Sequence, residues 1–159
     1  MTQLTVDIAD CVVSADPEAV IVTYALGSCI AVILHDPTRQ VGGMIHYMLP
    51  LSETSPEKAK DRPSMFADTG VPLLFQAMYS HGCDKKSLVI KVTGGGSLYD
   101  DKGMFNIGQR NYTVLRKIFW KNGVIIAAED VGGTKSRTAR IHVGTGKVTV
   151  RSQGEEVEL

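Results

Sequence analysis

Short apolar runs separated by polar breaks occur along most of the chain, which is typical of a protein rich in strands. Two of these runs, 26–34 and 41–49, flank the turn signal Asp36-Pro37-Thr38-Arg39 and are predicted to pair as an antiparallel hairpin, because proline presets the second turn position. Further strands are predicted at 4–9, 21–23, 87–93, 124–128, 138–143 and 147–151.

Two segments have helical spacing instead. One carries Val71, Leu74, Phe75 and Met78 and is closed by Gly82; the other carries Ile107, Val114, Leu115, Ile118 and Phe119 and is closed by Gly123. Residues 52–63 are polar and rich in proline, which predicts an exposed loop, and the acidic end from about residue 152 is predicted to be a solvated tail. Strands outnumber helices, so the predicted class is α/β (α+β): a layered sandwich of mixed, largely antiparallel sheet with two main helices.

The length, composition and charge of the chain limit the number of domains and the kinds of partner that we expect. A chain of 159 residues with 43% hydrophobic residues is sized for one domain over 1–159. Its 17 basic and 17 acidic residues cancel, so no broad positive field favours nucleic acid or anionic membrane, and a protein partner fits better. The N-terminus lacks the features of a signal peptide, which predicts a cytoplasmic protein without membrane insertion.

Cysteine and glycine usage excludes several kinds of site. Three cysteines without close pairs argue against a disulfide framework or a zinc site, and no metal or other cofactor is expected; Cys11 and Cys83 are predicted to be structural thiols. The runs 94–97 and 132–136 lack the GxxxxGK[ST] spacing of a phosphate-binding loop. They are predicted to be tight turns after strands, where glycine also permits close approach of the backbone to a substrate.

The strongest chemical signal is a cysteine followed by a histidine in the predicted hairpin. Cys29 lies where the turn Gly27-Ser28 becomes an apolar strand, and His46 lies on the next strand. A thiol nucleophile and its base require such a placement. An isolated cysteine or histidine in an apolar strand is more often structural than catalytic, so a purely structural interpretation remains open on these grounds alone.

Hairpin geometry tests whether the two side chains can meet. A two-residue loop at Pro37 and Thr38 would put Cys29 directly opposite His46, with Cβ atoms about 4.5–5.5 Å apart. A four-residue loop, Pro37 to Gln40, would make them diagonal neighbours on the same face. Only an odd register shift, such as a bulge, would separate their faces, so both loop lengths predict proximity.

Five motifs together resemble the chemoreceptor glutamine deamidases of the CheD family. They are Thr23-Tyr24-Ala25-Leu26-Gly27-Ser28-Cys29, His46-Tyr47-Met48-Leu49-Pro50, Gly94-Gly95-Gly96-Ser97, Asn106-Ile107-Gly108-Gln109-Arg110-Asn111 and Asp130-Val131-Gly132-Gly133. The resemblance covers residues from about 5 to about 151. It implies hydrolysis of glutamine side chains on bacterial chemoreceptors to glutamate, some hydrolysis of glutamyl methyl esters, and a fold similar to the deamidase domains of the cytotoxic necrotizing factor toxins.

The resemblance also assigns residues. The catalytic threonine, cysteine and histidine of the family fall on Thr23, Cys29 and His46, and the mechanism it implies passes through a cysteine thioester. Backbone N–H groups at Ser28 and Cys29 are oxyanion candidates, and Gly95, Gly96 and Ser97 are candidates for the oxyanion or substrate loop.

The family also implies a partner. Its glycine loop is implied in binding a CheC-type chemotaxis phosphatase, and the family commonly has Met-Phe where this chain has Leu98-Tyr99. Leu98 and Tyr99 are therefore predicted to contact that partner, since large apolar and aromatic side chains are common binding anchors. The alternative function is a binding module that docks to the phosphatase and stimulates it, with deamidation secondary.

Overall fold

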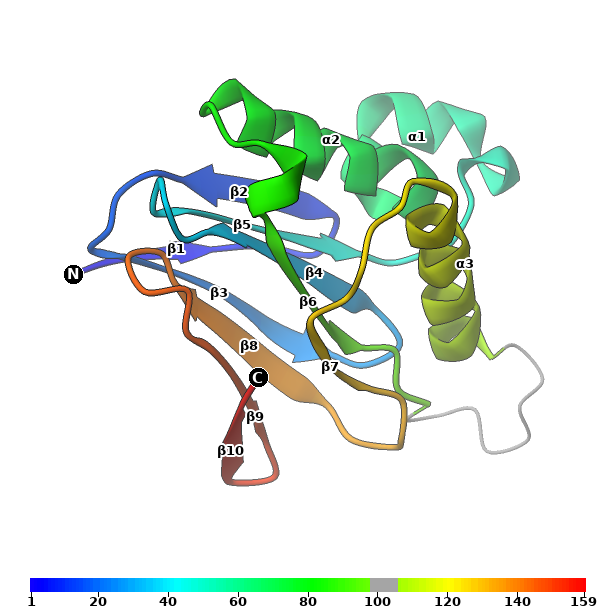
Figure 1. Cartoon of the computed structure of the whole chain (residues 1–159). Helices are drawn as coiled ribbons and strands as arrows, with labels where there is room; N and C mark the ends of the chain where they lie inside the picture. Colours follow the sequence, from blue (N-terminus) through cyan, green and yellow to red (C-terminus); the bar gives the residue numbers. More distant parts are fainter. Residues whose placement is uncertain (98–105) are drawn as a thin grey trace.

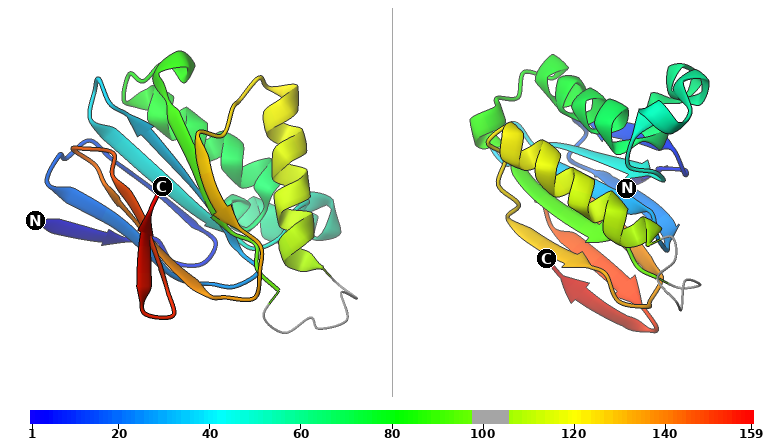
Figure 2. Two further views of the ribbon diagram at one scale, coloured as in Figure 1. Left: turned by 60° about the horizontal axis from the view of Figure 1, so that its bottom comes forward. Right: turned by 90° about the vertical axis from the view of Figure 1, so that its right-hand side faces the viewer.

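The described part of the chain, 1–97 and 106–159 in a computed structural model, forms two five-stranded sheets packed face to face, with helices on the far side of one of them (Figure 1, Figure 2). The outer sheet has the order β1 (Thr2–Thr5), β3 (Ala19–Leu26), β8 (Arg137–His142), β9 (Val148–Ser152) and β10 (Glu155–Glu158). The central sheet has the order β2 (Asp10–Ser14), β5 (Val41–Tyr47), β4 (Ile30–Asp36), β6 (Val89–Gly94) and β7 (Ala128–Val131).

Both sheets are mixed and largely antiparallel, as predicted. Among the described strands, only the β1–β3 and β6–β7 pairs run parallel. The central sheet lies between the helices and the outer sheet (Figure 2), so its strands are covered on both faces. All residues of β4 and β5 are buried, which explains why they have continuous apolar runs rather than strict alternation.

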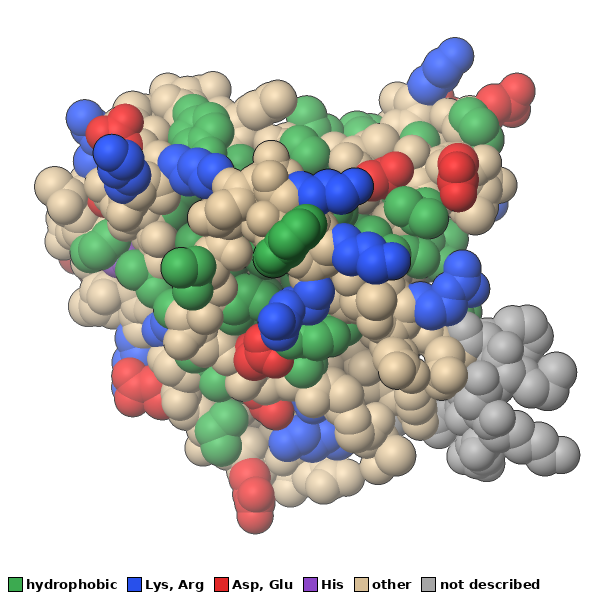
Figure 3. Space-filling model, turned by 45° about the vertical axis from the view of Figure 1, so that its right-hand side comes forward, with side chains coloured by type: hydrophobic (Ala, Val, Ile, Leu, Met, Phe, Trp, Pro, Cys, Tyr) green, Lys and Arg blue, Asp and Glu red, His purple; other side chains and the backbone are tan. Residues whose placement is uncertain are grey.

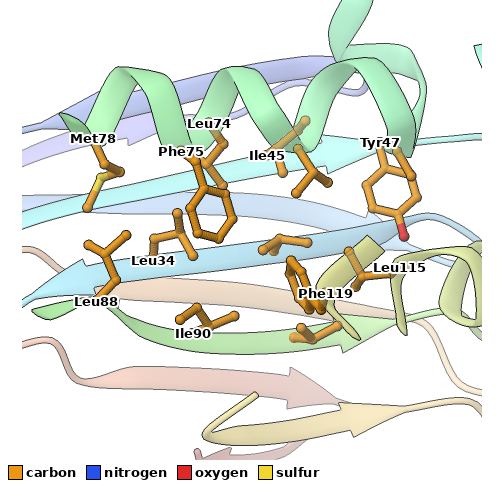
Figure 4. Close-up of a cluster of buried hydrophobic side chains, with 14 of the residues drawn as sticks. Leu34, Ile45, Tyr47, Leu74, Phe75, Met78, Leu88, Ile90, Leu115 and Phe119 are labelled. Atoms are coloured by element: carbon orange, nitrogen blue, oxygen red, sulfur yellow. The ribbon is translucent and has the colours of Figure 1, made fainter. Parts of the chain in front are cut away.

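Two main helices cover the central sheet. They are α2 (Ala67–Ser80) and α3 (Ile107–Lys121), and both were predicted from their apolar spacing. Short helices complete the described chain: η1 (Ser52–Thr54), α1 (Pro56–Asp61), η2 (Pro63–Met65) and η3 (Lys85–Ser87). Figure 4 shows the apolar side chains of α2 and α3 pointing onto β4, β5 and β6. We infer that this burial, rather than helix propensity, supplies most of the stability of both helices.

The hydrophobic core has two layers, one on each face of the central sheet. On β5, Ile45 and Tyr47 belong to the layer under the helices, whereas Met44 belongs to the layer between the sheets. Side chains alternate along a strand, so His46 points with Met44 into the space between the sheets. The site predicted at His46 is therefore placed inside the sandwich rather than under the helices.

The hairpin adopts the four-residue form of its two predicted loops. Asp36 pairs with Val41, and Pro37 to Gln40 form the loop. The Asp36 carboxylate accepts hydrogen bonds from the N–H groups of Thr38 and Arg39, at 2.9 and 3.2 Å, and Gln40 adopts a left-handed conformation with φ 55°. A side chain that caps its own turn is a common role of aspartate at the first turn position.

Several predicted elements are wrong or displaced. The acidic end is not a free tail, because Glu155–Glu158 forms β10 and pairs with β9. Residues 52–63 contain α1 and two 3₁₀ turns rather than only loop. The strand predicted at 124–128 begins at Ala128, and β2 was not predicted. No helix of the described residues is long and apolar enough to cross a membrane.

Candidate active site

Thr23, Cys29 and His46 come together where the chain crosses from one sheet to the other. Thr23 lies on β3 of the outer sheet, His46 lies on β5 of the central sheet, and Cys29 directly precedes β4. Ala31 is paired with His46, so Cys29, two residues earlier, is diagonal to His46 on the same face. Cys29 also packs against the apolar layer between the sheets. The predicted same-face geometry is thus confirmed.

A hydrogen-bond relay determines which nitrogen of the His46 ring carries the proton. The Thr23 Oγ1 hydroxyl donates to the Val6 carbonyl at 2.7 Å, and the same oxygen lies 2.7 Å from His46 Nδ1. A hydroxyl has one hydrogen, so Thr23 must accept from His46, which places the ring proton on Nδ1. His46 Nε2 is then a bare acceptor, and it is buried without a partner among the described residues.

Both members of the cysteine–histidine pair are neutral in the unliganded site. Burial raises the pKa of the Cys29 thiol to about 11, against the smaller lowering effect of its own backbone N–H. Burial lowers the pKa of the His46 imidazole to about 4. At neutral pH the site therefore holds a thiol and a neutral imidazole rather than a preformed ion pair, and an unprotonated Nε2 is the form that can accept a proton.

The turn that carries Cys29 is held through three successive carbonyl groups. The Gly27 carbonyl accepts from Gly96 N–H at 2.8 Å, and the Cys29 carbonyl accepts from Gly95 N–H at 2.8 Å. The Ser28 carbonyl between them accepts from Asn111 Nδ2 at 2.9 Å. The Ser28 and Cys29 N–H groups donate to no carbonyl in the described part of the chain.

These hydrogen bonds involve the three residues that were predicted to form an oxyanion or substrate loop. The N–H groups of Gly95, Gly96 and Ser97 donate to carbonyls of Cys29, Gly27 and Gly133, the last at 2.9 Å. In this conformation Gly95 and Gly96 hold the turn that carries Cys29, Ser97 binds the other glycine loop, and none of the three N–H groups is free to bind an oxyanion. Their contact with a substrate stays a prediction. Leu98 and Tyr99 lie outside the described residues.

Sequence reasoning missed several residues that support the site. Ala9 N–H donates to the His46 carbonyl at 2.8 Å, and Ala9 and Ala25 both have left-handed φ angles, 63° and 56°. Ala25 lies in the irregularity of the β3–β8 ladder between Thr23 and Leu26, and such bulges are frequent beside active sites. These features depend on long-range contacts, so no local sequence signal could have found them.

A buried arginine joins the two glycine loops. Arg137, 2% exposed, donates to the carbonyls of Gly94 and Gly132 at 3.2 and 2.8 Å, and its Nε lies 3.4 Å from an Asp130 carboxylate oxygen. A buried guanidinium bonded to carbonyls and a carboxylate has the partners that its burial requires. In the described residues, no group of three His, Cys, Asp or Glu side chains could hold a metal ion.

Comparison with known proteins identifies the family of the chain. A family model described as "CheD chemotactic sensory transduction" matches residues 48–152. The chain is 53% identical to a probable chemoreceptor glutamine deamidase CheD 1 of Syntrophus aciditrophicus, over 97% of this chain and 96% of that protein. It is 52% identical to a probable chemoreceptor glutamine deamidase CheD 2 of Anaeromyxobacter dehalogenans, over 99% and 98% of the two chains. It is 40% identical to the chemoreceptor glutamine deamidase CheD of Thermotoga maritima, over 88% and 87%. The chain therefore belongs to the CheD family.

Proposed function

We propose that this protein hydrolyses the side-chain amides of specific glutamines on the cytoplasmic domain of bacterial chemoreceptors, which yields glutamate and ammonia and contributes to adaptation in chemotaxis. The names of the relatives support an amide-hydrolysing enzyme that acts on chemoreceptors. The observation that carries the mechanism is the Thr23–His46 hydrogen bond, since it leaves a bare Nε2 on the face that Cys29 shares.

The first half of the reaction forms a thioester. His46 Nε2 takes the proton of the Cys29 thiol as Sγ attacks the Cδ carbon of the substrate glutamine. The tetrahedral intermediate collapses as Nε2 returns that proton to the amide nitrogen, which leaves as ammonia. Throughout, Nδ1–H remains bonded to Thr23, so the imidazolium that forms is stabilised and held in place.

The second half releases the product. A water molecule takes the place of ammonia, His46 Nε2 removes one of its protons, and the hydroxyl adds to the thioester carbon. The intermediate expels the Cys29 thiolate, which recovers its proton from His46. The carboxylic acid product then ionises to glutamate. No redox step is needed, because each half of the reaction balances with one proton transfer to His46 Nε2, one proton transfer from it, and one leaving group displaced at the carbonyl carbon.

The test replaces the three cysteines separately. Cys29→Ala is expected to abolish deamidation, whereas Cys11→Ala and Cys83→Ala are expected to retain it, since those two thiols pack in the core layer under the helices, on the other face of the central sheet from His46. Each protein would be incubated with a recombinant chemoreceptor cytoplasmic fragment. The readouts are ammonia release and a mass gain of about one dalton per site, the amide-to-acid difference. Glutamine conversion by Cys29→Ala at the wild-type rate would overturn the assignment of the nucleophile.

The remaining parts of the proposal rest on the resemblance. We infer that residues 1–159 act as one deamidase domain, that the enzyme works in the cytoplasm, and that a CheC-type phosphatase is its second partner. The residues predicted to contact the phosphatase, Leu98 and Tyr99, lie outside the described part of the chain. Capture of the phosphatase by Cys29→Ala would show that docking is separable from catalysis.

A further inference from the structure

Asn111 connects the two segments that carry the nucleophile and the base. It lies near the start of α3 and is completely buried. Its Nδ2 donates to the Ser28 carbonyl and to the Met48 carbonyl, each at 2.9 Å. Both partners are carbonyl oxygens, which fixes the orientation of the amide group, because only the nitrogen can donate. One side chain thus binds the residue before Cys29 and the second residue after His46.

The bond to Ser28 determines where the Cys29 N–H group points. A trans peptide is planar, with its C=O and N–H directed to opposite sides, and the described chain contains no cis peptide bond. Because Asn111 binds the oxygen of the Ser28–Cys29 peptide, the hydrogen of that peptide faces away from α3. This N–H lies close enough to its own thiol to favour the thiolate. It is therefore beside the atom that attacks the substrate.

We propose that Asn111 is a positioning residue that aims the Cys29 N–H as the oxyanion donor. The Gly27 and Cys29 carbonyls are held by Gly96 and Gly95, and Asn111 holds the peptide between them. The inference rests on the proposed function for the identity of the nucleophile. A donor aimed at the developing oxyanion acts on the transition state and leaves substrate binding nearly unchanged.

Packing alone does not account for an amide at this position. Asn111 Oδ1 is buried without a hydrogen-bond partner in the described residues. Burying an unfilled acceptor costs about 1–3 kcal/mol. Tyr47 lies on the strand that carries His46 and adds a further constraint. Its hydroxyl donates a 2.7 Å hydrogen bond to the main-chain carbonyl of Asn111. The amide therefore binds the segment before β4 and the segment after β5 despite a cost in stability.

The test separates oxyanion binding from thiol activation. The parent protein carries Cys11→Ala and Cys83→Ala, so that only Cys29 reacts with iodoacetamide. Asn111→Leu and Asn111→Ser would each be added to this parent. We expect kcat for deamidation of the receptor fragment to fall at least tenfold in Asn111→Leu with KM within about twofold, by analogy with the cost of losing an oxyanion donor. Alkylation of Cys29 has no oxyanion, so its rate is expected to stay within about twofold of the parent.

A control variant separates the role of the Asn111 amide from a general effect of substitution in α3. Asn122→Ala, at the end of α3, removes an amide whose hydrogen bond among the described residues is to the Ile118 carbonyl of its own helix, and it is expected to keep kcat and alkylation. Where Asn111→Leu does not fold, Asn111→Ser, which also removes the amide that binds the Ser28 carbonyl, takes its place, and a lower kcat with unchanged alkylation supports the proposal. An unchanged kcat, or equal losses of kcat and alkylation, would overturn it. Activity that survives Cys29→Ala would instead refute the proposed function.

Discussion

At the scale of single residues, the proposed reactivity of the site depends on one hydrogen-bond acceptor, Nε2 of the His46 ring. The relay from His46 through Thr23 to Val6 satisfies every donor in it and leaves Nε2 without a partner among the described residues. The Cys29 thiol and the His46 ring are both neutral, so proton transfer begins only when attack begins. Such an arrangement limits side reactions, because a thiol is a much weaker nucleophile than a thiolate.

Substitution of Thr23 tests the relay with a matched pair of variants. Thr23→Val keeps the shape of the side chain but leaves the Val6 carbonyl and the His46 N–H unsatisfied. We expect it to lose about 1–3 kcal/mol of unfolding free energy, the cost of such buried groups, and to lower kcat at least tenfold. Thr23→Ser keeps the hydroxyl and is expected to stay within about threefold of wild type. Urea unfolding and ammonia release measure the two effects.

The ring tautomer gives an independent readout of the same relay. Nitrogen-15 shifts of the His46 ring should show the proton on Nδ1 at pH 7 in wild type and in Thr23→Ser. In Thr23→Val this preference should weaken. A Thr23→Val protein with wild-type kcat and an unchanged tautomer would contradict the positioning role of the hydroxyl.

At the scale of elements, the hairpin and the two main helices were predictable because each has a local signal. The turn signal at Asp36 limited the loop to two or four residues, and both loop lengths kept Cys29 and His46 on one face. The helices are marked by apolar spacing at 71–78 and 107–119. Cys29 and His46 could therefore be placed together from sequence alone.

Other elements lacked such a signal. All five residues of β2 are half-buried, so no clean alternation marks the strand, and its pairing with β5 is long-range. The acidic residues of β10 are exposed and resemble a tail, yet the strand pairs with its neighbour β9 through backbone hydrogen bonds. The clamp at Asn111 escaped prediction for a similar reason, since its acceptors lie 83 and 63 residues away along the chain.

Gly108 tests the contact between α3 and the glycine loop. Helix propensity alone would make Gly108→Ala stabilising by about 1 kcal/mol. However, a Cβ at this position would meet the carbonyl oxygens of Gly95 and Gly96 well inside van der Waals contact. We expect Gly108→Ala to be destabilising by about 1–3 kcal/mol and to reduce kcat, because displacing Gly95 and Gly96 releases the Cys29 turn.

The matched control lies at the other end of the same helix. Gly123 has a positive φ of 65°, and a Cβ at this position would meet no atom within 4 Å, so Gly123→Ala should cost about 1 kcal/mol of stability and leave kcat unchanged. Thermal melts and ammonia release on both variants make the comparison. A stabilised Gly108→Ala enzyme with full activity would show that the helix–loop contact does not support the site.

At the scale of the whole molecule, the surface carries charges of both signs. Basic and acidic side chains both occur over the face shown in Figure 3, as expected for a chain whose net charge is zero. Trp120 and Ile125 stand out near the end of α3, because they are 81% and 83% exposed. The residues of the candidate site by contrast are enclosed, with Thr23 and His46 completely buried.

Burial of His46 predicts a pH dependence of global stability. Its pKa is lowered to about 4 in the folded protein from 6.5. Between these values the unfolded chain binds a proton that the folded chain does not, so stability falls as pH falls, by up to about 1.4 kcal/mol per unit. Urea unfolding should therefore show wild type losing up to about 2 kcal/mol between about pH 6.5 and 5. His46→Gln, which has no titrating ring, should lose correspondingly less, and an equal slope in both proteins would refute the assignment.

The placement of the proposed triad has a consequence for the cell. Thr23 belongs to the outer sheet, His46 belongs to the central sheet, and Cys29 directly precedes a strand of the central sheet. Glutamine is present on the surface of nearly every protein, so an enzyme active before its fold was complete would damage its neighbours indiscriminately. The Thr23–His46 hydrogen bond forms only after the two sheets have docked, so the proposed mechanism predicts that a nascent or partly denatured chain is inactive. The complete fold is thus required before the proposed base can act, which would protect other proteins from unintended deamidation.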